Sequence, residues 1–245
     1  MEYYGYQDGL IHRYLSQNGA WDSHVRKCRG YILKAIERLA PEKVTILGSG
    51  WLIEVPLLEI SEKVKEVTLV DIIHPKAVIE QTSKINNVRL IETDITGGII
   101  DDLWNKTNSL FPFRKRIDIN SIDFPEFKPD NDPGLLISLN LLSQLDSLPV
   151  RLIKKRAPVS ENDLHTFRKK IQENHISFLK KYPSVLISDL CEIYTDKNGV
   201  ATVEKTVLAD IPDGKLPEQW IWDFDLTGTD YNMKKSVLEV HAIIL

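Results

Sequence analysis

The sequence feature that most constrains the fold is a glycine turn between two apolar runs, in the stretch VTILGSGWLIEVPL at residues 44–57. The first apolar run ends at Gly48, and a helix is expected to begin near Trp51. A second apolar run ends at Asp71, about 20 residues beyond the glycines. In a parallel α/β sheet, such glycines let the backbone approach a ligand, and the acid accepts hydrogen bonds from ribose hydroxyls. The pattern therefore predicts a nucleotide-type cofactor at the carboxyl edge of a parallel sheet.

Ile53 and Glu54, which follow the glycines, indicate which cofactor this turn holds. Glu54 is expected in the first helical turn, where a dinucleotide site places its pyrophosphate, and Ile53 stands where such sites favour a small residue. A ligand with a sulfonium and an ammonium, such as S-adenosylmethionine, tolerates a nearby carboxylate better than a diphosphate does. The alternative for Glu54 is that it only complements the helix dipole.

Composition and charge exclude several classes of protein. The formal net charge of -4 argues against the broad basic surface that nucleic-acid binding requires. Cys28 and Cys191 are far apart in the sequence, so neither a metal site nor a disulfide framework is indicated. The N-terminus lacks the basic and apolar regions of a signal peptide, and no apolar run has the length of a membrane span. We therefore expect a cytoplasmic protein without a metal, nucleic-acid or membrane partner.

The apolar pattern predicts one α/β domain behind two helices. Residues 1–40 form an N-terminal helical extension, and Pro41 separates it from an α/β domain at residues 41–245. Five buried strands are expected at 44–47, 67–70, 88–92, 135–139 and 185–187. Residues 107–134 are expected to be a loop insertion with a short strand near Ile117, and Ser160 to cap a helix. Beyond the fifth strand, an Asn-Gly turn predicts a hairpin, and two antiparallel strands end the chain.

Polar residues follow four of these strands. Asp71, Asp94, Asn140 and Asp189 come after the second to fifth strands in turn. Because parallel strands end at one edge of the sheet, these side chains are expected to face one crevice.

With these features the sequence resembles the class I S-adenosylmethionine-dependent methyltransferases. LGSG matches their glycine-rich motif, Asp71 the ribose-binding acid, and Asp94 the residue near the adenine amine. Asn140 occupies the position where substrate and methyl group usually meet. The resemblance implies a Rossmann-like α/β domain at residues 41–245, with a mostly parallel seven-stranded sheet, an antiparallel last strand and helices on both faces. It also implies that the helical extension at residues 1–40 is a lid. It also implies S-adenosylmethionine as cofactor, and these cofactor-binding residues: Gly48, Ser49, Gly50, Trp51 and Glu54 at the methionine end, Asp71 and Ile72 at the ribose, Asp94 and Ile95 at the adenine, and Asn140.

The sequence departs from the family pattern at two positions of the glycine turn. Ile46 stands where an acid commonly precedes the first glycine, and Leu52 stands where the third glycine is expected; Glu54 is interpreted as a partial replacement for the acid. The fourth strand also lacks the N/D-P-P-Y/W signature of enzymes that methylate bases. A small-molecule acceptor is therefore expected.

The acceptor side of the site is predicted from position alone. Candidate substrate contacts are Trp21, His24 and Arg26 in the N-terminal helices and Gln144 and Asp189 at the sheet edge, each of which packing or surface exposure also explains. No catalytic residue is assigned, because methyl transfer from a sulfonium requires positioning and exclusion of water but no fixed triad. Two alternatives stay open, a nicotinamide-dependent oxidoreductase and a non-catalytic module that binds an adenosyl ligand. The oligomeric state also stays open.

Overall fold

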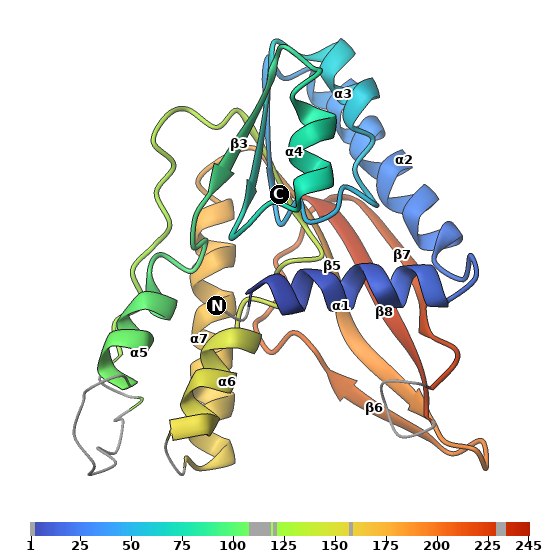
Figure 1. The fold of residues 1–245 in the computed structure, drawn as a ribbon, viewed down its shortest axis with the longest axis vertical. Helices are drawn as coiled ribbons and strands as arrows, with labels where there is room; N and C mark the ends of the chain where they lie inside the picture. The colour runs from blue at the N-terminus through green and yellow to red at the C-terminus, as the bar shows by residue number, and fades with distance from the viewer. Residues whose placement is uncertain (1–2, 108–118, 120–121, 157–158, 229–233) are drawn as a thin grey trace.

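A mixed β-sheet with helices packed on both faces forms the centre of the protein (Figure 1). The structure is a computed structural model that describes residues 3–107, 119, 122–156, 159–228 and 234–245. Its strands are β1 (Lys43–Leu47), β2 (Glu66–Asp71), β3 (Val88–Glu92), β4 (Leu135–Leu139), β5 (Ser184–Thr195), β6 (Ala201–Lys205), β7 (Lys215–Asp225) and β8 (Lys235–Ile244). Its helices are α1 (Tyr3–Ser16), α2 (Asp22–Leu39), α3 (Leu57–Lys63), α4 (Lys76–Thr82), α5 (Ile99–Thr107), α6 (Ser147–Arg156) and α7 (Glu161–Leu179).

The strand order β3-β2-β1-β4-β5-β8-β7 places five parallel strands beside an antiparallel pair. β8 runs antiparallel to β5, and β7 runs antiparallel to β8. This confirms the predicted Rossmann-like sheet with an antiparallel last strand. The strand order reverses between β1 and β4, and a sheet of this kind leaves a crevice for ligands at that point.

The sheet of the described residues has eight strands, one more than predicted, because β5 is longer than its apolar core at 185–187. β5 continues past the end of β4 to Thr195, and its far half pairs with β6. The turn between them contains Asn198 and Gly199, as the hairpin prediction required. The eighth strand is therefore an extension of the sheet and leaves the order of the other seven unchanged.

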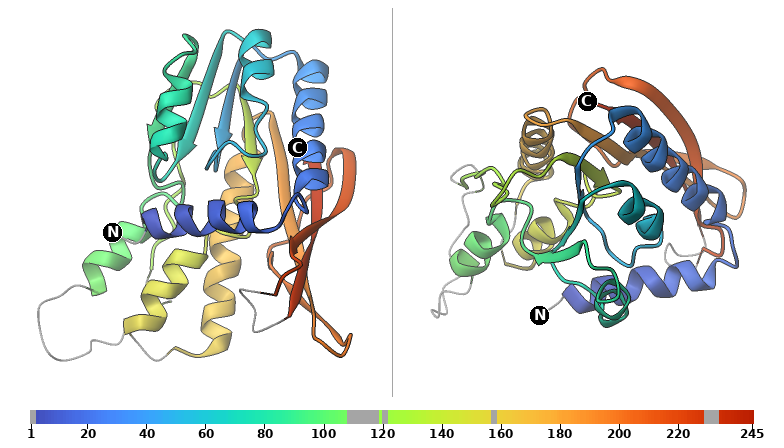
Figure 2. Two further views of the ribbon diagram at one scale, coloured as in Figure 1. Left: turned by 45° about the vertical axis from the view of Figure 1, so that its right-hand side comes forward. Right: turned by 90° about the horizontal axis from the view of Figure 1, so that it is seen from above.

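Each face of the sheet is buried under its own layer of helices (Figure 2). Alternate residues of a strand point to opposite faces. In β4, Leu135 and Ile137 belong to the core shared with α2 and α3, whereas Leu136 belongs to the core shared with α5, α6 and α7. Strands buried on both sides are apolar throughout, which explains the uninterrupted runs in the sequence.

The two N-terminal helices have different positions. α1 lies across the end of the parallel sheet toward which β1 points, whereas α2 runs beside the strands (Figures 1 and 2). Val25 and Ile32 of α2 are buried in the same core as Trp220 of β7. The hydroxyl of Tyr31 also donates to the carbonyl of Leu216, at 3.0 Å. Within the predicted 1–40 extension, α2 is thus part of the core, and α1 is the element in position to cover the sheet edge.

The helix predicted from Trp51 begins only at Leu57, so the prediction that Glu54 lies in its first turn was wrong. Leu52 has a left-handed backbone with φ 60°, which interrupts a right-handed helix. Pro56 then disfavours helical backbone at the residue before it. Residues 51–56 are consequently a loop, and Glu54 reaches its position without a helix dipole.

The region between β3 and β4 contains a helix that the sequence pattern did not predict, α5, and α6 after β4 was also missed. Residues 122–134 of the predicted loop insertion have no helix or strand. Residues 108–118, with the predicted short strand near Ile117, lie outside the described residues. The N-cap of α7 is confirmed, since Ser160 Oγ accepts from the backbone N–H of Asp163. Among the described helices, none combines the length and apolar character that a membrane span needs.

Candidate functional site

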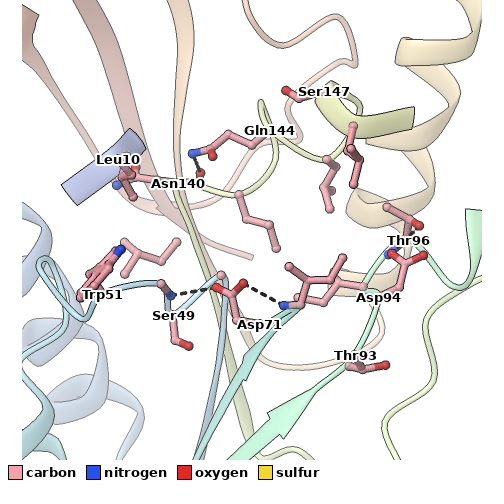
Figure 3. A pocket seen from close by; sticks show the side chains of 18 of the residues that line it. Leu10, Ser49, Trp51, Asp71, Thr93, Asp94, Thr96, Asn140, Gln144 and Ser147 are labelled. Atoms are coloured by element: carbon pink, nitrogen blue, oxygen red, sulfur yellow. Dashed lines mark hydrogen bonds between the residues drawn. The ribbon is translucent and has the colours of Figure 1, made fainter. Parts of the chain in front are cut away.

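A pocket opens at the carboxyl ends of the parallel strands, where the strand order reverses, and encloses about 1110 Å³, part of it open to solvent (Figure 3). The structure brings all ten predicted cofactor-binding residues to its wall: Gly48, Ser49, Gly50, Trp51, Glu54, Asp71, Ile72, Asp94, Ile95 and Asn140. These residues follow the ends of four strands, β1 to β4. In the sequence, only their positions after predicted strands indicated that they lie together. Gln144, a predicted substrate contact, also lines the pocket.

The glycine turn approaches β4 closely. Gly48 has φ 78°, and its N–H donates to the carbonyl of Val70 at 2.9 Å. A Cβ on Gly48 would lie 3.0 Å from the carbonyl oxygen of Leu139 and 3.1 Å from Cβ of Leu141. Both the dihedral angle and the close approach therefore require glycine.

Asp71 connects the glycine turn to the end of β2. Its Oδ2 accepts from the backbone N–H of Gly50 at 2.8 Å, and its Oδ1 accepts from the N–H of Ile72 at 2.8 Å. Burial raises the pKa of this carboxyl, and hydrogen bonds from the backbone N–H groups of Gly50, Ile72 and Ile73 oppose that change. Each carboxylate oxygen can accept more than one hydrogen bond. Asp71 can therefore hold the turn and accept ligand hydroxyls at the same time.

Asp94 lies farther along the pocket and organises the start of α5. Its Oδ1 accepts from the N–H of Thr96 at 2.8 Å and from the Thr96 hydroxyl at 2.6 Å, and its Oδ2 accepts from the N–H of Ile100 at 3.3 Å. Ile95 and Ile100 are both buried and line the same part of the wall. This end of the pocket is an apolar slot beside a fixed carboxylate.

The sequence pattern missed several pocket residues because they are apolar or far away in the chain. Leu10 comes from α1, Leu145 and Leu148 from the segment around the start of α6, and Trp222 from β7. Trp222 reaches the pocket only through the antiparallel pairing of β7 with β8 and of β8 with β5. No local signal marks such a residue; only the long-range strand pairing reveals it.

Four predicted substrate residues do not line the pocket. Arg26 lies on the exposed side of α2, and Trp21 is 1% exposed and donates from Nε1 to the carbonyl of Phe224 at 3.0 Å. His24 is completely buried behind the pocket wall. Asp189 is buried below the loop after β4, where it accepts from the Ser143 hydroxyl at 2.6 Å, and burial raises its pKa.

The charge of the pocket is negative on one side. Glu54, Asp71 and Asp94 are acidic, and among the described residues of the wall there is no lysine, arginine or histidine. The Glu54 side chain is 14% exposed, and its Oε1 lies 3.7 Å from Nε2 of His24. In the described part of the chain, no group of three or more His, Cys, Asp and Glu side chains is arranged to hold a metal ion.

Unpaired polar atoms gather at the same wall. Six buried side-chain N or O atoms of the described residues have no hydrogen-bond partner, and three of them belong to residues that line the pocket. These three are Oγ of Ser49, Oδ1 of Asn140 and Nε1 of Trp222. A buried polar atom without a partner is costly, so such atoms are expected to meet a ligand.

No protein-family model matches the chain, and no curated protein does. Among solved structures, it is similar to DhpI in complex with S-adenosylhomocysteine, with 13% identity, 96% of this chain and 97% of that chain covered, and a TM-score of 0.34. It is also similar to the N-methyltransferase NodS from Bradyrhizobium japonicum WM9 with the same ligand, with 10% identity, 89% and 86% covered, and a TM-score of 0.35. The glycopeptide N-methyltransferase MtfA, again with S-adenosylhomocysteine, has 12% identity, 86% and 89% coverage, and a TM-score of 0.29. The order and directions of its strands show a Rossmann-like fold with an antiparallel last strand.

Proposed function

We propose that the protein binds S-adenosylmethionine in this pocket and transfers its methyl group to a small-molecule acceptor. The observation that carries the proposal is the pocket's charge combined with its shape. Three carboxyl side chains and no described cationic side chain line a crevice at the switch point of the sheet. A sulfonium and an ammonium are attracted to such a site, whereas the two phosphates of a nicotinamide dinucleotide are repelled.

The residues of the wall fit the parts of the cofactor. The turn at Ser49 and Gly50, with Glu54 beside it, would hold the methionine end, and Asp71 would accept from the ribose hydroxyls. The apolar slot at Ile95 and Ile100, beside Asp94, would enclose the adenine. When bound, the cofactor supplies a methyl group on a positively charged sulfur.

The protein contributes orientation and exclusion of water, the two requirements of an in-line displacement. Leu10 of α1 lines the pocket, so α1 is placed to cover the reacting groups. Asn140 and Gln144 lie on the β4 side of the wall, and the Gln144 amide donates to the carbonyl of Asn140 at 2.6 Å. In the proposed reaction, Asn140 contacts the cofactor and Gln144 orients the acceptor.

The first experiment measures ligand binding by calorimetry. S-adenosylmethionine and S-adenosylhomocysteine should bind, and NADH should not. Asp71→Asn removes the charge and places an amide N–H against a backbone N–H, so the affinity for both adenosyl ligands should fall about 10- to 150-fold for each hydrogen bond lost to a charged group. Asp101→Asn, on the exposed side of α5, is the matched control and should bind as the wild type does.

Unchanged affinity in a folded Asp71→Asn protein would contradict the proposal, as would tighter binding of NADH. A second measurement separates binding from chemistry by following the formation of S-adenosylhomocysteine with a panel of small amines, alcohols and thiols. Binding without turnover across the panel would favour the non-catalytic adenosyl-binding module over the enzyme.

A further inference from the structure

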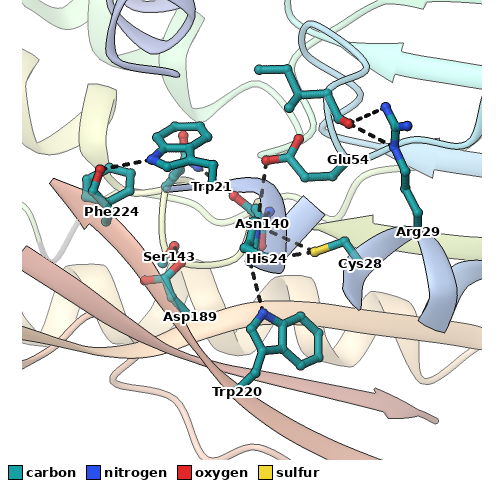
Figure 4. Close-up of polar contacts among 12 residues, drawn as sticks. Trp21, His24, Cys28, Arg29, Glu54, Asn140, Ser143, Asp189, Trp220 and Phe224 are labelled. Atoms are coloured by element: carbon teal, nitrogen blue, oxygen red, sulfur yellow. Dashed lines mark hydrogen bonds and ion pairs between the residues drawn. The ribbon is translucent and has the colours of Figure 1, made fainter. Parts of the chain in front are cut away.

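His24 lies at the centre of a buried network directly behind the pocket wall (Figure 4). Its ring stacks on Trp222, with ring centroids 3.8 Å apart and planes 4° from parallel. Its Nδ1 faces the indole N–H of Trp220 at 3.0 Å, and its Nε2 lies 3.1 Å from the side-chain amide of Asn140. The imidazole therefore contacts two residues that line the pocket, although it does not line the pocket itself.

Trp220 fixes which nitrogen of His24 carries the proton. An indole nitrogen can only donate a hydrogen bond, so Nδ1 of His24 must accept. A neutral imidazole with an unprotonated Nδ1 carries its proton on Nε2. A doubly protonated ring would point a second N–H at the indole N–H and lose this contact. The geometry is thus compatible only with the neutral ring protonated at Nε2.

This proton in turn orients the amide of Asn140. The nearest polar group to Nε2 is that amide, at 3.1 Å, with Sγ of Cys28 at 3.5 Å and Oε1 of Glu54 at 3.7 Å. An N–H at Nε2 requires an acceptor, so the amide must turn its oxygen toward His24 rather than its nitrogen. The nitrogen then takes the other amide position, which has no partner among the described residues and belongs to a residue of the pocket wall. Asn140 therefore offers the pocket an N–H donor.

The backbone of Asn140 is fixed at the pocket wall. Asn140 has φ 47° and is 8% exposed, so its side chain is held in a turn where few conformations are available. Its backbone N–H donates to the carbonyl of Ile187 at 2.8 Å. Rotation about the last bond of the side chain exchanges the oxygen and the nitrogen of the amide and leaves the amide group in the same place.

We propose that His24 is a positioning residue for the ligand site: the Trp220 indole holds it as the Nε2–H tautomer, and it holds the Asn140 amide with the N–H donor toward the bound adenosyl ligand. The proposal rests on the proposed function in one respect, that an adenosyl ligand occupies the pocket. The ligand group that meets Asn140 is accordingly a hydrogen-bond acceptor, such as a carboxylate or ether oxygen.

The tautomer can be tested on the free protein, without any ligand. Proton–nitrogen correlation spectra of histidine rings distinguish a protonated from an unprotonated ring nitrogen. The ring signals that are missing in the His24→Gln variant belong to His24. The Trp220→Phe variant, which lacks the indole N–H, shows the same ring without that donor. We expect an unprotonated Nδ1 and a protonated Nε2 in the wild type at neutral pH. A protonated Nδ1, alone or together with Nε2, would overturn the proposal.

The positioning role is tested by a double-mutant cycle on the affinity for S-adenosylhomocysteine. Trp220→Phe removes the N–H and keeps an aromatic ring, and it should weaken binding about 2- to 12-fold, the range for one neutral hydrogen bond. In the Asn140→Ala background the same change should have no further effect. Trp104→Phe, at a tryptophan that is 46% exposed, is the matched control and should bind normally.

An equal loss on Trp220→Phe in both backgrounds would show that His24 does not act through Asn140 and would refute the proposal. No loss on Trp220→Phe in the wild-type background would refute it as well. Complete absence of binding to the wild type would instead refute the proposed function, while the ring spectra would still decide the tautomer of His24.

Discussion

A buried histidine away from the pocket should make the stability of the protein fall in mild acid. His175 of α7 is 4% exposed, and its Nε2 lies 2.9 Å from the hydroxyl of Ser138 in β4. Burial lowers the pKa of His175 from 6.5 to about 4. Protonation therefore costs more in the folded protein than in the unfolded chain.

The sign and size of the effect follow from these two pKa values. Between pH 6.5 and about 4 the unfolded chain binds more protons than the folded protein, so the stabilisation is complete above pH 6.5 and is lost as the pH falls through this range. From pH 7 to pH 5 the free energy of unfolding should decrease by about 2 kcal/mol on account of His175 alone, and by about 3 kcal/mol at pH 4.

Urea unfolding of the wild type and of His175→Gln at pH 7 and pH 5 measures this contribution. The glutamine does not titrate but can still hydrogen-bond to Ser138, so the wild type should lose about 2 kcal/mol more than the variant. Other titrating groups occur in both proteins and cancel in the difference. His165→Gln, on the exposed side of the same helix, should keep the wild-type pH dependence. Equal losses in the wild type and His175→Gln would show that the burial argument is wrong.

Three further variants test local parts of the fold by urea unfolding at pH 7. Gly134→Ala should lower the free energy of unfolding by at least about 1–2 kcal/mol, since Gly134 has φ 65° and a Cβ there would lie 2.3 Å from the carbonyl oxygen of Lys43; wild-type stability would contradict this. Gln172→Leu should cost about 2–6 kcal/mol, because this buried amide donates to the carbonyl of Thr206 and accepts from the N–H groups of Leu208 and Ala209, and its two shorter hydrogen bonds leave groups worth about 1–3 kcal/mol each when unpaired. A loss below 1 kcal/mol would mean that water replaces the amide. Ser160→Ala should cost about 1 kcal/mol by removing the cap bond to Asp163, whereas Ser160→Gly should cost only a few tenths; equal costs would argue against the cap.

The sequence was sufficient to predict the parallel half of the sheet and the pocket residues that it carries. Apolar runs buried on both faces mark parallel strands, and a polar residue at the end of each run marks the edge where the strands meet. Asp71, Asp94 and Asn140 were found by this rule, and the structure places all three at one pocket. The rule holds where the strand ends at the polar residue. It was wrong for Asp189, because β5 continues to Thr195 and Asp189 lies inside the strand, buried against Ser143.

The parts that could not be predicted depend on contacts between distant segments. Trp222 lines the pocket because β7 pairs with β8, and nothing in its local sequence distinguishes it from Trp220, which lies behind the wall. His24 was predicted as a substrate contact, but its position one layer back depends on how α2 packs against β7. The prediction of a helix directly after Gly50 was wrong for a local reason. The left-handed backbone of Leu52 and the proline at position 56 disfavour a helix more than the apolar periodicity favours one.

The structure shows what the two residues that depart from the resembled glycine motif, Ile46 and Leu52, do in this chain. Leu52 stands in the place of the third glycine, yet it has φ 60°, the left-handed conformation that glycine adopts without strain. The cost of about 1–2 kcal/mol for that conformation is offset by burial of the leucine side chain, which contributes about 1.5–3 kcal/mol and is 5% exposed. Ile46 stands where the motif has an acid. Its side chain is fully buried in the core, so in this chain that position serves the packing of the sheet. Glu54, two residues after Leu52, lines the pocket instead, and it can do so because the left-handed turn prevents a helix from forming there.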